Sequence, residues 1–245
     1  MKLIAALLAT ILLAPVSPAQ IASSTSSPSN ASVLAAQAIA PFSQGNIASV
    51  HLSGTAHAIA GSTDETGTFT FDIQNSGTSN LQIEAGALTN DDVTGAFDGD
   101  PACTWSGKDG VKHSVAQHNC ALSVNWMLPA MAVETRGAKL SIASVDNPVD
   151  SGPAISVSVL VKNTKKEAMR YAKLTTVTMA VDSSSLPRWL SYSTHPDDDE
   201  NTDIPILVRY SDYRQVSGAT IPFHIQKYIN NGLALDLQVE NATVQ

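Results

Sequence analysis

Residues 203–245 read DIPILVRYSDYRQVSGATIPFHIQKYINNGLALDLQVENATVQ and carry the clearest folding signal in the chain. Apolar side chains occupy alternate positions in three successive segments, as expected for strands with one buried face. The turn sequences Ser217-Gly218 and Asn230-Asn231-Gly232 separate these segments and favour tight hairpins. We therefore predict an antiparallel sheet whose apolar face includes Ile204, Ile206, Val208, Tyr210, Ile221, Phe223, Ile225, Leu233, Leu235, Leu237 and Val239.

Much of the chain before these hairpins also has strand character. The further strand segments are 47–60, 67–74, 80–88, 155–161, 175–181 and 189–194, and a short Ala-rich helix is expected at 33–40. Gly, Ser, Thr and Asp separate many of these segments, which is typical of antiparallel connections. We predict one domain over residues 33–245, mainly β with a helical insertion (α+β), which is an ordinary size for such a fold.

The helical insertion is expected within residues 118–133. Leu122, Trp126, Met127 and Met131 recur there at helical spacing, and Pro129 either kinks one helix or opens a second. A short apolar segment of this kind cannot bury its own stripe. We therefore expect it to cover one face of the sheet.

The N-terminal residues resemble an export signal. Lys2 precedes an apolar run, and the small residues Ser17 and Ala19 fit cleavage before Gln20. The run is shorter than the roughly 20 residues that a membrane-spanning helix needs. We predict a signal peptide at 1–19, a flexible Ser-rich tether at 20–32, and export to the periplasm, with secretion as the alternative.

The charge distribution argues against nucleic-acid binding. The chain has 14 Lys and Arg residues against 22 Asp and Glu residues, for a formal net charge of −8. Between Lys2 and Lys108 there is no basic Lys or Arg side chain. This half of the chain therefore cannot form the basic surface that binding to phosphates requires.

Two cysteines are too few for a disulfide-dense miniprotein or a multi-cysteine zinc module. In an exported chain, we expect Cys103 and Cys120 to form a disulfide. Buried free thiols are the alternative.

Several C-terminal motifs resemble the closing hairpins of LolA-like proteins, the outer-membrane lipoprotein-sorting proteins and their RseB and LppX relatives. They are DIPI at 203–206, RYSDYR at 209–214, Ser217-Gly218 and IPFHI at 221–225, and AQAIAPF at 36–42 is similar to the short helix that opens such domains. The resemblance implies a curved antiparallel sheet, a half-barrel covered by short helices. It also implies an apolar concave cavity that holds acyl chains or a lipoprotein.

The resemblance leads us to expect a non-catalytic protein that binds a lipid or a lipidated partner and needs no cofactor. The candidate lining residues are large, apolar and adaptable in shape. They are Phe69, Phe71, Trp126, Met127, Met131 and Phe223. The alternative is that these side chains form an ordinary packed core.

The segment His195-Pro196-Asp197-Asp198-Asp199-Glu200 supports a different hypothesis, an exported metal-dependent hydrolase that uses the loop from His195 to Asp199. Oxygen-bearing side chains at alternate positions, from Asp197 to Asp203, also suggest a weak calcium site. Because only hairpins follow this loop, we favour a solvated acidic loop that binds no metal.

Two further surfaces have functional alternatives. The basic stretch Lys162, Lys165, Lys166, Arg170 and Lys173 could contact anionic head groups or an acidic partner, or could be a solvated hairpin tip. A free edge of the sheet could bind a peptide by strand addition, as in a structural or sensory domain.

Overall fold

A computed structural model describes residues 33, 47–86, 88–94, 103–123, 126–128, 140–147, 149–150, 152–159, 165–196 and 198–245. The expected signal peptide, Ser-rich tether and most of the N-terminal helix lie outside these residues. Their assignment stays a prediction.

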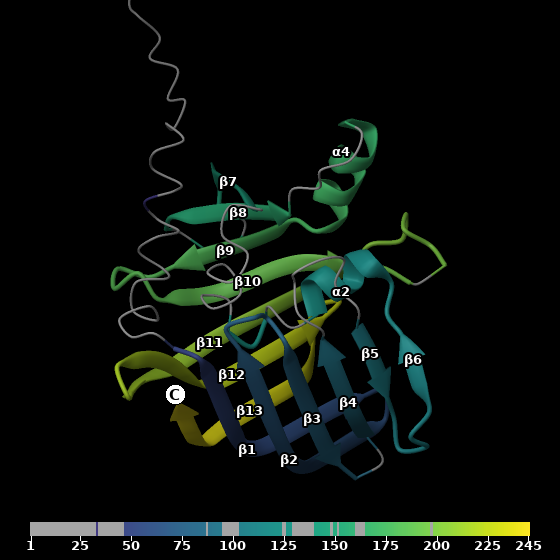
Figure 1. The fold of residues 1–245 in the computed structure, drawn as a ribbon, viewed down its shortest axis with the longest axis vertical. Helices are drawn as coiled ribbons and strands as arrows, with labels where there is room; N and C mark the ends of the chain where they lie inside the picture. The colour runs from purple at the N-terminus through teal and green to yellow at the C-terminus, as the bar shows by residue number, and fades with distance from the viewer. Residues whose placement is uncertain are drawn as a thin grey trace, which may run out of the picture.

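The described residues form one antiparallel sheet of 13 strands, with the order β6-β5-β4-β3-β2-β1-β13-β12-β11-β10-β9-β8-β7 (Figure 1). Figure 1 shows that the sheet is strongly curved and remains open. This confirms the predicted mainly β half-barrel. The strands are β1 Ser49–Ala60, β2 Thr63–Gln74, β3 Ser79–Ala85, β4 Leu88–Thr94, β5 Cys103–Ser106, β6 Lys112–Ser114, β7 Leu140–Val145, β8 Ala154–Val159, β9 Val177–Val181, β10 Pro187–Thr194, β11 Ile204–Val216, β12 Ala219–Ile229 and β13 Gly232–Val244.

Most of the C-terminal hairpin register follows the predicted alternation. The prediction was wrong for Leu233, because β12 and β13 shift register between Lys227 and Tyr228, and Leu233 lies opposite Tyr228 outside the hydrophobic cluster. Ile225 pairs with Tyr210 on one side and with Leu237 on the other, and all three side chains are buried. The turn residues Ser217 and Gly218 have positive φ angles of 48° and 88°. Such angles match the right-handed twist of the flanking strands and fix the hairpin.

Close backbone approach accompanies the curvature of the sheet. The pairing of β1 with β13 shifts register between Ser53 and Gly54. A β-carbon at Gly54 would lie 2.0 Å from the carbonyl oxygen of Gln238, so no larger residue fits there without a backbone shift. A register shift of this type bends a strand and increases its twist.

The outer, convex face of the sheet carries polar cross-strand pairs. His51 lies 2.7 Å from Asp72, and His57 lies 2.5 Å from Asp64. Further along, His224 lies 3.0 Å from Asp236. Because polar groups occupy this face, the apolar side chains of the same strands lie on the opposite, concave face.

Two helices are described, α2 Gln117–Ser123 and α4 Lys165–Leu174. Leu122 of α2 and the following residues 126–128 pack in the same hydrophobic cluster as the strands, which confirms that the helical insertion covers the sheet. Helix α2 occupies the first part of the predicted range 118–133, residues 126–128 are not helical, and residues 124–125 and 129–133 lie outside the described residues. Among the described residues, no helix is long and apolar enough to cross a membrane.

Other parts of the prediction were wrong. The basic stretch forms helix α4 and not a hairpin tip, because its sequence KKEAMRYAKL consists mostly of good helix formers. The amide and hydroxyl groups of Thr175 both donate to the carbonyl of Tyr171 at the end of this helix. Strands β4 to β7 were also missed, since they are short or rich in polar residues.

We expect Leu237→Ala to lower the free energy of unfolding by about 2–5 kcal/mol, because it removes a fully buried side chain from the concave face. The exposed Asn241 of the same strand provides the control, and Asn241→Ala should change stability by less than about 0.5 kcal/mol. Urea unfolding measures both variants. Similar stability losses for the two would contradict the assigned faces.

Candidate functional site

The concave face forms one hydrophobic layer that joins distant parts of the sheet. Side chains of β1, β2 and β3 share a cluster with side chains of β10 to β13, and residues 122 and 126–128 close this layer. Met127 has no exposed surface, and Leu128 is only 2% exposed. Helix α2 therefore belongs to the cover of the concave face (Figure 1).

The structure brings together five of the six predicted lining residues. Phe69 and Phe71 of β2, Phe223 of β12, and Trp126 and Met127 of the cover are all buried in this layer. Met131 lies outside the described residues. The shared layer agrees with both sequence-based interpretations, a ligand site and a packed core, so ligand binding by these residues stays a prediction.

Charged and polar groups meet the apolar layer beside Trp126. The Lys227 ammonium nitrogen of β12 lies 4.6 Å from the ring centroid of Trp126, which is a cation–π arrangement. The Tyr210 hydroxyl donates a hydrogen bond of 2.5 Å to the carbonyl of Trp126. Tyr210 thus helps to position the indole ring beneath the ammonium group.

Asp92 of β4 contributes the opposite charge to this region. Burial raises the pKa of Asp92, and the positive charge of Lys227 opposes that rise. Burial likewise lowers the pKa of Lys227, and Asp92 opposes this shift. The buried Tyr192 of β10 has a raised pKa, chiefly from burial and secondarily from the charge of Asp92. Desolvation thus outweighs charge attraction at both Asp92 and Lys227.

Sequence reasoning missed Lys227 and Asp92. Lys227 follows Phe223 and Ile225 at two-residue spacing, so the alternation already placed it on the concave face. Alternation along this strand is therefore sufficient to predict the position of Lys227. Asp92 belongs to β4, whose sequence LTNDDVT is too polar to be recognised as a strand by its apolar periodicity.

The loop after β10 is organised by a buried histidine and an asparagine. The His195 ring lies 2.9 Å from the carboxylate of Asp203. The side chain of Asn119, from α2, donates to the carbonyl of His195 at 2.6 Å and accepts from its amide at 3.1 Å. These contacts fasten α2 to the end of β10.

The acidic side chains of this loop point to different partners. Asp199 accepts hydrogen bonds from Asn201 and Thr202 within its own turn, whereas Glu200 binds Arg170 of α4. The Arg170 hydrogen bond lowers the pKa of Glu200. Asp197, which the hydrolase and calcium hypotheses include, lies outside the described residues. Within the described part of the chain, no three His, Cys, Asp or Glu side chains converge to hold a metal ion.

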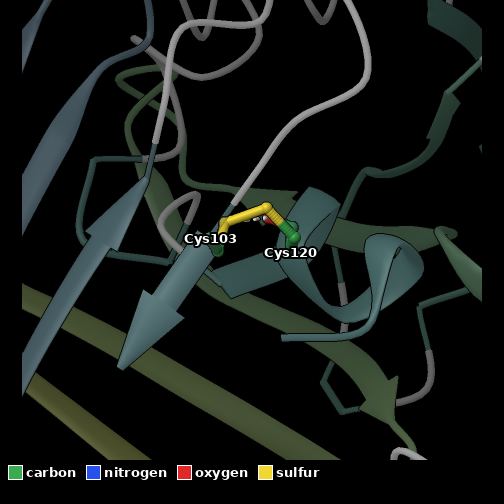
Figure 2. Close-up of a disulfide and its surroundings, with 2 residues drawn as sticks. All are labelled: Cys103 and Cys120. Atoms are coloured by element: carbon green, nitrogen blue, oxygen red, sulfur yellow. Dashed lines mark hydrogen bonds between the residues drawn. A yellow bond between two sulfur atoms is a disulfide. The ribbon is translucent and has the colours of Figure 1, made fainter. Parts of the chain in front are cut away.

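A disulfide joins Cys103 to Cys120, as predicted (Figure 2). Their Cα atoms are 5.4 Å apart, and both residues are buried. Cys103 opens β5, while Cys120 lies in α2. The bond therefore fastens the helical cover to the strand beside β4.

The basic stretch lies on a solvent-exposed helix. Lys166, Arg170 and Lys173 of α4 are exposed, as is Met169 between them. Lys162 lies outside the described residues. Interaction of this surface with head groups or an acidic partner stays a prediction.

Solved structures with the same fold belong to LolA-related proteins. A domain assigned as an outer membrane lipoprotein-sorting protein, from Vibrio parahaemolyticus, matches with a TM-score of 0.55 at 8% identity, over 89% of this chain and 94% of that one. A LolA superfamily protein from Nitrosomonas europaea matches with a TM-score of 0.52 at 10% identity, over 88% and 93%. These likenesses confirm the LolA-like fold that the C-terminal motifs predicted.

A third structure has a comparable likeness. It is a DUF1329 family protein from Desulfovibrio piger, with a TM-score of 0.52 at 9% identity, over 88% of this chain and 93% of that one. No protein-family model matches the sequence, and no curated protein matches it. At such low identities the likeness establishes the fold, and function must be argued from the residues.

We expect replacement of both cysteines by alanine to lower the free energy of unfolding by about 3 kcal/mol, because the disulfide closes a short loop and restricts the unfolded chain. Chemical unfolding with and without reductant measures the effect. Reductant should destabilise the wild type to a similar degree and leave the double variant unchanged. Two titratable thiols in the oxidised wild type would contradict the pairing.

We expect Asp92→Asn to gain stability relative to the wild type as the pH rises from about 4. The pKa of Asp92 is raised in the folded state above its ordinary value of 3.8, so the folded chain retains a proton that the unfolded chain releases. Wild-type stability therefore falls through this pH window, whereas asparagine does not ionise. Unfolding measured at several pH values tests this, with the exposed Asp146→Asn as control. A constant difference between Asp92→Asn and the wild type would refute the assignment.

Proposed function

We propose that this chain is a non-catalytic binding protein that holds an acyl chain of a lipid or lipidated protein against the concave face of its sheet. One observation carries the proposal. Among the described residues, Leu122 and residues 126–128 cover the apolar layer, and no second sheet lies over it. A short cover can be displaced from a sheet at much lower cost than an entire layer of strands.

The energy of binding would come from burial of methylene groups. Each buried CH₂ contributes about 0.8 kcal/mol, so an acyl chain of about ten buried carbons supplies roughly 8 kcal/mol before the costs of binding. Part of this gain must offset the contacts that Met127 and its neighbours make in the free protein. Met127 suits the exchange because its flexible side chain repacks readily.

Export of the chain, with the periplasm as the compartment, belongs to the same proposal. The N-terminal sequence has the features of a cleavable signal, and the Cys103–Cys120 bond suits an oxidising compartment. Two of the structures with this fold carry the names of LolA-related proteins, one of them a lipoprotein-sorting domain. This supports acyl chains as the ligand class.

Mass spectrometry of lipids that co-purify with the mature protein tests the proposal first. Rebinding of a fluorescent fatty-acid probe to delipidated protein then tests the site. We expect Met127→Asp to abolish probe binding, because it places a carboxylate in the apolar layer. The matched control is Met169→Asp, which makes the same change at a side chain that is 66% exposed and should bind like the wild type.

Thermal unfolding of the same samples distinguishes a ligand site from a packed core. A Met127→Asp protein that stays folded but binds no probe supports a ligand site. One that unfolds, at a cost of several kcal/mol, identifies Met127 as part of the core. A wild-type protein that carries no lipid and binds no probe would remove the carrier function altogether.

A further inference from the structure

Lys227 occupies a position that the rest of its strand gives to apolar side chains. Phe223 and Ile225 precede it at two-residue spacing and are buried on the concave face. In the neighbouring strands, Lys227 lies opposite Val208 and Leu235, which are also buried. Lys227 is half-buried, and its ammonium group is costly to desolvate among these side chains unless other groups compensate its charge.

The surroundings of Lys227 compensate its charge only in part. The ammonium group lies against the face of the Trp126 ring, at 4.6 Å from the centroid. Asp92 attracts it, but in the part of the chain that the structure describes no carboxylate forms an ion pair with Lys227 within 4.0 Å. An ammonium placed beside an apolar layer, with no close counterion, is suited to receive an anion from a ligand.

We propose that Lys227 binds the acid group of an anionic amphiphile whose acyl chain lies in the adjoining apolar layer. This inference rests on the proposed function and specifies its ligand class, a chain that ends in a carboxylate or a phosphate. The Trp126 ring borders the acid group, and the chain extends from there toward Met127 and Phe223. A neutral lipid would leave the Lys227 charge as it is in the free protein.

Asp92 and Tyr192 are compatible with such a ligand. Because the pKa of Asp92 is raised, its carboxyl group takes up a proton more readily than an exposed aspartate when an anion arrives nearby. Tyr192 keeps its hydroxyl proton because burial raises its pKa. The neutral Tyr192 hydroxyl presents a hydrogen-bond donor to an acid group, and uptake of a proton by Asp92 would remove the repulsion from its carboxylate.

Binding of dodecanoate and of 1-dodecanol to delipidated protein tests the proposal, since the two probes share a chain length and differ in charge. We expect the wild type to bind dodecanoate about tenfold more tightly or better, because a charge-assisted contact forms with only one of them. Lys227→Met should weaken dodecanoate binding to the level of dodecanol and leave dodecanol unchanged. Lys227→Arg should retain the preference.

The possible failures are distinguishable. Equal affinity of the wild type for both probes overturns this inference and leaves the proposed function intact. If neither probe binds, the proposed function is overturned and the inference with it. If inorganic phosphate binds on its own and competes with dodecanoate, the site is one for a free anion. That result also overturns the inference that the ligand is an anionic amphiphile. Equal wild-type affinity for the two probes overturns the inference even if Lys227→Met fails to fold.

Discussion

One continuous sheet has to bury a large apolar concave face, and much of the fold follows from this constraint. Polar pairs such as His51–Asp72 occupy the convex face, so the concave side chains must be removed from water. Curvature achieves part of this burial by bringing β2 and β3 into the same apolar layer as β11 and β12. The cover around Met127 completes it, and the Cys103–Cys120 bond fastens that cover to the sheet.

The sequence predicts best those elements whose local signals are strong. The hairpins after residue 203 were predictable because alternation and turn residues agree there. The strand LTNDDVT of β4 was not, because half-buried polar side chains give no apolar period. The predicted hairpin tip is helix α4, because the helix propensity of its residues decides the local structure more than their charges do. At the candidate site, the sequence predicts the large apolar residues, and strand alternation also places Lys227 on the concave face. Asp92 requires knowledge of which strands face each other across the curved sheet, because β4 has no apolar period.

The concave layer combines two kinds of energetics. The free energy of apolar burial depends on the area that is buried and little on the direction of the contacts. Apolar side chains can therefore rearrange at low cost. The contacts of Lys227 with Trp126, and of Tyr210 with the Trp126 carbonyl, are directional and fix one region of the layer. In the proposed function, such a layer accepts acyl chains of different shape along most of its length, and Lys227 recognises one end by charge. Such a division is common in small-molecule sites, where a few polar groups set the orientation of the ligand.

The pairing of β1 with β13 determines when the domain can assemble. Val50 lies opposite Val244, so the seam in the middle of the strand order joins segments that are nearly 200 residues apart in the chain. A growing polypeptide cannot form this seam until its final strand has emerged, and contacts of such long range form slowly. Until the seam forms, both halves of the sheet expose strand edges and apolar faces to solvent. During this interval the chain is susceptible to aggregation and accessible to chaperones.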